Sequence, residues 1–329
     1  MDQNLNYLLT SLVVFVGVKI LLESKQSDPQ QYSLNMNKIK KITKKISITR
    51  QIDTLNLKKV KQYVMSLISN KMHVFEQSFT QKIKFYDDEI NPKDYNLSNI
   101  IAYNKNCNPN ISKFILLAAH IDSYKNIECA TDSATSIAII IDIANKILKI
   151  KPEFPLMIVF FDGEESINDK WNIKTSLFGS RYFVKNFLNN LTNPTTTNLT
   201  NQFNVKIAYI LDLIGGDVTK KISAFKDNPR ANHIINHMYK INKNYKNNKN
   251  YKNKNYSDEI FVSTKKHISD RVMYDDHLPF QEQNINYVHL IPYVFPNNHH
   301  KAEDNYSNVD WIYTEIFGNV LFNHLLTYY

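Results

Sequence analysis

The sequence predicts an α/β protein in which helices cover both faces of a mostly parallel central sheet. Short, uninterrupted apolar runs alternate with longer segments of helical periodicity along 329 residues. Such unbroken apolar runs are typical of strands that are buried on both faces of a parallel sheet. The apolar fraction of 43% is high enough for a large core. The two cysteines exclude a scaffold built from disulfides.

The predicted elements follow one another in regular order. Helical periodicity begins within residues 46–80. Four apolar runs then predict strands, at 114–119, 156–161, 205–213 and 285–291. The segments between and after them predict helices at 133–150, 180–188, 232–241 and 310–328. Because strands and helices alternate, we expect helical crossovers that make neighbouring strands parallel.

Two segments of different composition precede the predicted domain, which we assign to residues 46–329. Residues 1–25 contain the apolar run 7–22, which we interpret as a signal or membrane-anchor segment. The alternative is an amphipathic helix packed on the domain. An anchor would place the protein in the secretory pathway or at a membrane. Residues 26–45 are polar and predict a linker, and residues 241–256 predict a low-complexity insertion rich in Asn, Lys and Tyr.

The formal charge of +9 does not by itself predict a nucleic-acid partner. Lysine supplies 36 of the 40 basic residues, whereas arginine, which makes bidentate contacts with phosphates and bases, supplies only four. Asparagine is also abundant, with 42 residues, so the excess resembles a genome-wide bias in composition. We therefore expect no nucleic-acid partner. No glycine-rich phosphate-binding motif occurs among the six glycines.

Acidic and imidazole side chains gather where the predicted strands end. In an open α/β sheet the carboxyl ends of the strands form the ligand-binding edge, so these side chains are expected to meet. Asp, Glu and His are the ligands of a catalytic zinc that keeps one position open. Taken singly, Asp132 could be a helix N-cap and Glu164-Glu165 a solvated turn. The candidate residues at or near these ends are His120, Asp122, Asp132, Glu164, Glu165, Asp212, Asp275, His289, His299 and His300.

Six motifs, in order and spacing, resemble those of the glutaminyl-peptide cyclotransferases, the animal-type glutaminyl cyclases. They are Ala-Thr-Asp-Ser-Ala (130–134), Phe-Phe-Asp-Gly-Glu-Glu (160–165), Ser-Leu-Phe-Gly-Ser-Arg (176–181), Leu-Asp-Leu-Ile-Gly (211–215), Asp-Asp-His-Leu-Pro-Phe (275–280) and His-Leu-Ile-Pro (289–292). The resemblance runs from about residue 45 to the C-terminus. It implies the fold of the zinc aminopeptidases in a single catalytic domain.

The resemblance also implies a set of site residues. One zinc ion per chain would be held by Asp132, Glu165 and His300. Glu164 matches the glutamate that moves protons, and Asp212 and Asp275 match the family's supporting acids, which we expect to share a proton.

The substrate pocket implied by the resemblance contains four further residues. His289 matches the family's pocket histidine. Trp171 matches its pocket tryptophan, although one extra residue precedes it here. Together with Phe295, Trp171 would form the pocket wall. His299 stands where the family has a tryptophan next to the metal-binding histidine, which puts the packing of the substrate in doubt.

The implied reaction is the cyclisation of an N-terminal Gln to pyroglutamate with release of ammonia, so the implied partners are peptides or proteins that begin with Gln. A zinc aminopeptidase is the main alternative, because His120 and Asp212 could hold a second metal beside the first. A binding protein without activity is the third interpretation, although no ligand position has been lost. Nothing in the sequence demands an oligomer, and we expect a monomer.

Overall fold

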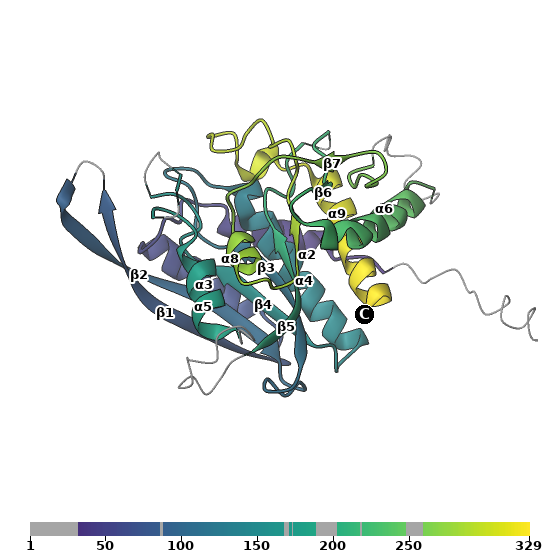
Figure 1. Ribbon diagram of the computed structural model, residues 1–329, viewed down its shortest axis with the longest axis horizontal. Coiled ribbons are helices and arrows are strands. Elements are labelled where there is room, and N and C mark those ends of the chain that lie inside the picture. The colour runs from purple at the N-terminus through teal and green to yellow at the C-terminus, as the bar shows by residue number, and fades with distance from the viewer. Residues whose placement is uncertain are drawn as a thin grey trace, which may run out of the picture. The chain divides into compact units, whose positions relative to one another are not determined.

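The computed structural model is built around a six-stranded sheet (Figure 1). Its strand order is β1-β2-β4-β3-β5-β8. The structure describes residues 32–85, 88–167, 171–172, 174–188, 203–217, 219–247 and 259–329. The strands are β1 (Met72–Phe85), β2 (Asp88–Asn104), β3 (Lys113–His120), β4 (Leu156–Phe161), β5 (Asn204–Leu211) and β8 (Tyr287–Leu290). Neighbours among β4, β3, β5 and β8 are parallel, whereas β1 and β2 pair antiparallel with each other and β2 with β4. A separate parallel pair joins β6 (Ala224–Phe225) and β7 (Ile268–Ser269).

Helices cover both faces of the sheet, as the sequence predicted. On one face, α4 packs on β3 and β4 and also contacts α2 and α9. On the opposite face, α5 packs on β2 and β4 and contacts α8. The helices are α2 (Met36–Ile46), α3 (Leu55–Leu67), α4 (Thr135–Ile150), α5 (Phe178–Phe187), α6 (Asn232–Asn247), α8 (Leu278–Glu282) and α9 (Trp311–Tyr328). Two short 3-10 turns, η2 (Pro229–Ala231) and η3 (Tyr306–Asn308), complete the elements outside the site.

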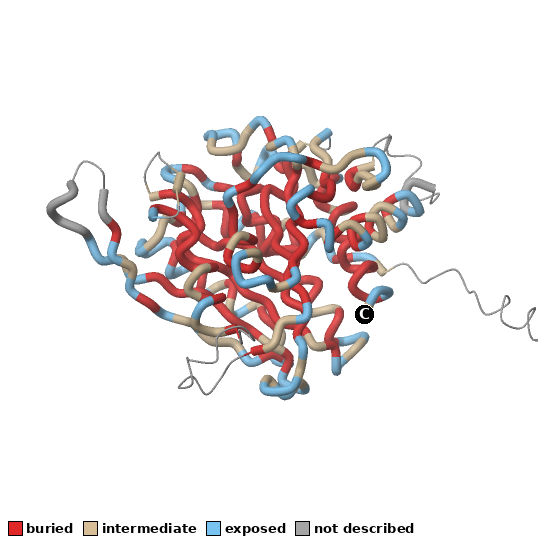
Figure 2. Tube along the Cα trace, viewed as in Figure 1, coloured by how far each residue is buried: buried red, intermediate tan, exposed pale blue. Residues whose placement is uncertain are grey.

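The central strands are buried along almost their whole length (Figure 2). Alternate residues of β3, Phe114, Leu116 and Ala118, join the apolar cluster that contains Phe183 of α5 and Phe280 of α8. Burial of one such large apolar side chain stabilises a fold by about 1.5–3 kcal/mol. The core therefore holds the strands rigidly, and with them the residues at their carboxyl ends.

The hairpin formed by β1 and β2 was not predicted. The sequence pattern was interpreted as helical over 46–80, but the helix α3 ends at Leu67 and a strand begins at Met72. Exposed polar residues such as Glu76, Ser78 and Thr80 weaken the apolar signal of β1. This is typical of an edge strand, where polar side chains oppose pairing with a further strand. In Figure 1 the hairpin leaves the centre of the sheet towards the left of the view.

The predicted linker at 26–45 is wrong over its second half. Residues from Met36 onward form α2, whose Ile39, Ile42 and Ile46 are buried and whose N-cap Asn35 accepts a hydrogen bond from Lys38 N–H. A period of three to four residues between these isoleucines buries one face of a helix that is otherwise rich in lysine.

Two other predicted segments lie wholly or partly outside the described residues. The helix α6 continues to residue 247, so the expected insertion at 241–256 begins as helix, and residues 248–256 are not described. The apolar run at 7–22 is also outside the described residues, and the secretory or membrane location stays a prediction that rests on it. Within the described ranges, none of the helices has the length and apolar character needed to cross a membrane.

Arg50, which is fully buried, ties the N-terminal helix α2 to the loop that follows β3. Its guanidinium donates to the carbonyl oxygens of Ile121 at 2.9 Å, Cys129 at 3.0 Å and Asp132 at 3.3 Å, and also to that of Glu128. It further donates to Ile46 and Ile48 at the end of α2, at 3.3 Å each. One side chain thus satisfies carbonyl groups from two separate segments.

We expect the substitution Arg50→Met to lower the free energy of unfolding by about 3 kcal/mol, because several buried carbonyl groups lose their donor. The measurement is the urea midpoint. Lys58→Met, which removes an exposed cation from α3, serves as the matched control and should change stability by less than about 0.5 kcal/mol. Equal midpoints for the two variants would contradict this role of Arg50.

Candidate active site

The carboxyl ends of the parallel strands carry the acidic residues that the sequence singled out. Glu164 and Glu165 follow β4, and Asp212 follows β5 directly. Asp132 lies in the short turn η1 (Ala130–Ala134), between β3 and α4. All four side chains are buried. The loop after β8 brings His300 to the same edge of the sheet, as expected for the ligand-binding edge of an α/β sheet.

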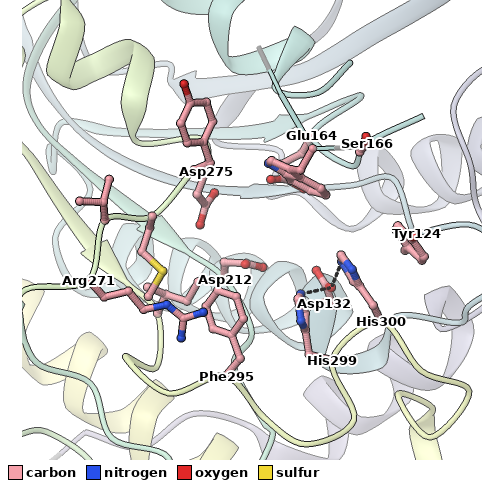
Figure 3. A pocket seen from close by; sticks show the side chains of 15 residues that line it. Tyr124, Asp132, Glu164, Ser166, Asp212, Arg271, Asp275, Phe295, His299 and His300 are labelled. Atoms are coloured by element: carbon pink, nitrogen blue, oxygen red, sulfur yellow. Dashed lines mark ion pairs between the residues drawn. The ribbon is translucent and has the colours of Figure 1, made fainter. Parts of the chain in front are cut away.

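Asp132, Glu165 and His300 meet as the sequence predicted for three metal ligands. The Nε2 atom of His300 lies 3.3 Å from Oε2 of Glu165 and 3.6 Å from Oδ2 of Asp132, and the contact with Asp132 is visible in Figure 3. Two ligand atoms at about 2.0–2.1 Å from a tetrahedral zinc ion lie about 3.3 Å apart. The two distances from His300 are therefore compatible with a shared zinc ion. Among the described residues, the groups whose candidate ligand atoms all lie within 4.8 Å of one another include His120 with Asp132 and Glu165, and His299 with His300 and Asp132.

The electrostatics of the two carboxylates also fit a cation. Neither oxygen of Glu165 has a hydrogen-bond partner among the described residues, although both are buried. Burial, together with Glu165 and Asp212, raises the pKa of Asp132 to about 8. Burial, opposed by His120 but helped by Asp122, raises the pKa of Glu165 to about 8. A divalent ion between these groups would satisfy the orphaned oxygens and offset the repulsion.

His120 bridges two of the acids from the side away from His300. Its Nε2 atom lies 2.8 Å from Oδ1 of Asp132 and 3.3 Å from Oδ1 of Asp212. Although burial opposes it, the hydrogen bonds to Asp122, Asp132 and Asp212 raise the pKa of His120 well above its usual value. Although burial again opposes it, the hydrogen bond with His120 lowers the pKa of Asp212 to about 2. His120 therefore links Asp132 and Asp212 through its Nε2 atom.

Asp122 orients the glutamate pair. Its two carboxylate oxygens accept the backbone N–H groups of Glu164 and Glu165, each at 3.1 Å. The side chain of Glu164 faces the cavity (Figure 3). Burial raises the pKa of Glu164 well above its usual value, and the charges of Glu165 and Asp275 add to the shift. Its place at the cavity and the upward shift of its pKa are features of a general acid-base group.

A cavity of about 340 Å³ opens beside these groups. Trp171, Phe295 and His299 line it, as the sequence predicted for the substrate pocket. The lining comprises Tyr124, Asp132, Glu164, Ser166, Trp171, Asp212, Arg271, Val272, Met273, Tyr274, Asp275, Ile291, Phe295, His299 and His300. The site thus combines buried acids at its base with aromatic walls.

One prediction about the pocket needs correction. His289 does not line this cavity. Its Nε2 atom lies 2.6 Å from Oδ2 of Asp275, and its ring borders a smaller neighbouring cavity. We also expect Asp212 and Asp275 to share a proton; in the structure the two carboxylates form hydrogen bonds with different partners. Asp212 accepts from Ser133, whereas Asp275 pairs with His289. Asp212 directly follows β5, whereas Asp275 lies just before α8, and each has its own hydrogen-bond partner.

His300 stands in a stack of rings. Tyr124 is parallel to it at 4.0 Å between centroids, and His299 stacks at 3.8 Å. Phe295 meets His299 edge-on at 4.7 Å. Burial, followed by the neighbouring His300, lowers the pKa of His299 to about 4, so the His299 ring is neutral at neutral pH. His299 thus supplies a flat neutral surface at the position where a tryptophan was expected.

Sequence reasoning missed two residues of the site. Tyr124 packs on His300, and Arg271 lines the cavity. Neither belongs to one of the recognised motifs. Their signals were weak: Tyr124 comes two residues after Asp122, and Arg271 is one of only four arginines.

Comparison with known proteins gives a consistent result. The profile of peptidase family M28 matches residues 99–324. A glutaminyl-peptide cyclotransferase of Dictyostelium discoideum is 31% identical, over 91% of this chain and 85% of the relative. One from Drosophila melanogaster is 26% identical, over 82% of this chain and 75% of the relative. A solved glutaminyl cyclase of Macrostomum lignano shares the fold, with a TM-score of 0.74, 22% identity and coverage of 89% and 88%.

We expect Asp132→Ala to lose bound metal, because the variant removes one of three ligands and leaves Glu165 and His300 without the third. Metal content per chain, measured by mass spectrometry of the dialysed protein, should fall at least about tenfold. Asp94→Ala, an exposed acid on β2, is the control and should keep its metal. A folded Asp132→Ala protein that still binds one metal ion per chain would contradict the assignment of Asp132 as a metal ligand.

Proposed function

Because the chain belongs to peptidase family M28 and, within it, to the glutaminyl-peptide cyclotransferases, we propose that it converts N-terminal Gln of peptides or proteins to pyroglutamate with release of ammonia. The observation that supports this reaction best is the position of Glu164. Its carboxyl, with a raised pKa, lines the same cavity as Asp132 and His300, two of the three candidate metal ligands. A proton-transfer group and an electrophilic site therefore share one pocket.

Asp132, Glu165 and His300 would hold one zinc ion, which would act as a Lewis acid on the side-chain amide of the substrate. The Asp122 carboxylate holds the backbone of Glu164 and Glu165, so the two side chains keep different directions and different tasks. His120 fixes the second oxygen of Asp132. The three ligands are thereby pre-organised.

Glu164 would carry the proton. It accepts a proton from the substrate's α-amine, whose nitrogen then attacks the side-chain amide carbon. A nitrogen–carbon bond forms and closes the five-membered ring. Glu164 then returns the proton to the amide nitrogen, the carbon–nitrogen bond to it breaks, and ammonia leaves. The same carboxyl serves as base and then as acid, so Glu164 ends the cycle in the state in which it began.

The remaining pocket residues would hold the substrate and limit water. Asp275, oriented by its 2.6 Å contact with His289, and Asp212, oriented by Ser133, offer acceptors for the leaving nitrogen. Trp171, Phe295 and His299 form apolar walls beside them. Water is the competing nucleophile in a peptidase, so a walled pocket favours attack by the substrate's own amine.

A zinc aminopeptidase is the competing function, because His120 and Asp212 occupy the positions for a second metal. Two peptides separate the possibilities, one that begins with Gln and one that begins with Leu, each incubated with the protein and analysed by mass spectrometry. We expect the Gln peptide to lose one ammonia, the Leu peptide to remain intact, and a zinc chelator to stop the reaction. Removal of the leading Leu would instead establish a peptidase.

We further expect Glu164→Gln to lower turnover at least about 100-fold, because the proton carrier is lost. Metal content should stay at the level of the unchanged protein, since Glu165 and not Glu164 is the proposed ligand. Glu153→Gln, an exposed glutamate outside the site, is the matched control. A loss of metal from Glu164→Gln would show that the roles of the two glutamates are reversed.

A further inference from the structure

One rim of the cavity is formed by residues 270–274, between β7 and Asp275. Met273 anchors this segment in an apolar cluster with Phe225 and Ile291. The anchoring leaves Val272 and Tyr274 exposed, at 77% and 53% of their surface. The rim therefore presents apolar surface to whatever extends out of the cavity.

Arg271 is the sole lysine or arginine among the side chains that line the cavity. Its guanidinium carbon lies 4.1 Å from the centroid of the Phe295 ring, an arrangement that Figure 3 shows beside Asp212. Its Nη1 atom donates to the carbonyl oxygen of Tyr293 at 3.3 Å, and its backbone N–H donates to the hydroxyl of Ser269. The guanidinium is thus held in place by stacking and one hydrogen bond, while it retains further N–H donors.

A row of rings connects Arg271 to the candidate metal ligand. Phe295 contacts Arg271, His299 contacts Phe295, and His300 stacks on His299. In the proposed reaction the side chain of the N-terminal Gln points to His300 and its amine to Glu164. The substrate can leave the pocket only through its carbonyl group, and each further residue advances by at most about 3.6 Å. The second residue of such a substrate would therefore extend from the cavity, whose lining includes Arg271, Val272 and Tyr274.

We propose that Arg271 selects substrates that carry a carboxylate directly after the N-terminal Gln, such as peptides that begin Gln-Glu or Gln-Asp. This inference rests on the proposed cyclase function. A guanidinium binds a carboxylate through two parallel hydrogen bonds, and it repels a lysine or arginine at the same place. Val272 and Tyr274 pack against the methylene groups of the second residue.

The test uses three peptides that begin Gln-Glu, Gln-Gln and Gln-Lys and are otherwise identical. We expect kcat/KM, measured from ammonia release at low salt, to be highest for Gln-Glu and lowest for Gln-Lys. Exposed ion pairs contribute up to about 1 kcal/mol, so each step should be about two- to fivefold. The preference should shrink at 1 M salt, because the pair lies at an exposed rim.

Arg271→Gln should bring the three kcat/KM values together, mainly by lowering that of Gln-Glu. Arg271→Lys keeps the charge without the planar fork and should retain part of the preference. Lys185→Gln, an exposed lysine on α5, removes the same charge far from the rim and should leave the preference unchanged.

Equal rates for the three peptides with the unchanged protein would overturn the inference. So would an equal loss for all peptides in Arg271→Gln, because Arg271 would then act only by positioning Phe295. If no peptide is cyclised, the cyclase function fails separately. In that case the selectivity of Arg271 is tested by binding alone. The dissociation constants of the three peptides are measured by calorimetry, and equal constants would overturn the selectivity.

Discussion

The burial of many carboxylates at one edge of the sheet is the constraint that shapes this protein. Asp122, Asp132, Glu164, Glu165 and Asp212 are each nearly or fully removed from solvent. Uncompensated charges of one sign cost several kcal/mol each in such a place. The fold compensates them with His120 and with hydrogen bonds from backbone N–H groups, and the two Glu165 oxygens, which have no hydrogen-bond partner among the described residues, fit the metal ion proposed above.

Buried negative charge is also compensated by residues farther from the site. Lys61 of α3 is buried and pairs with Asp162, the residue between β4 and the glutamate pair, and it also donates to Ser98 of β2. Burial raises the pKa of Asp162 to about 6, although Lys61 opposes that shift. Arg50 supports the loop that carries Asp132 in a similar way. The helices α2 and α3 therefore support the site, which explains why α2 does not behave as a linker.

The buried parallel strands and the strand-end acids were predictable, because long apolar runs and charges beside them leave a strong mark on a sequence. The hairpin of β1 and β2 was not, since an edge strand such as β1 carries polar residues on its exposed positions and loses the alternation that identifies it. Contacts between loops also could not be predicted from the sequence. Tyr124, for example, packs on His300, which is 176 positions away along the chain. For His289 the sequence motif identified the residue correctly as a neighbour of the site. The motif did not show on which side of Asp275 the His289 ring lies.

The order of the ligands along the chain has a consequence for biosynthesis. Asp132 and Glu165 emerge from the ribosome early, whereas His300 follows 135 residues after Glu165. At about 5–20 residues per second, translation of that interval takes roughly ten seconds. During this time the third candidate ligand is missing from the chain, and a preformed three-ligand site cannot exist. A metal site made of these three side chains would therefore be completed only after His300 is translated, so metal binding would follow the folding of the strands that carry the two acids.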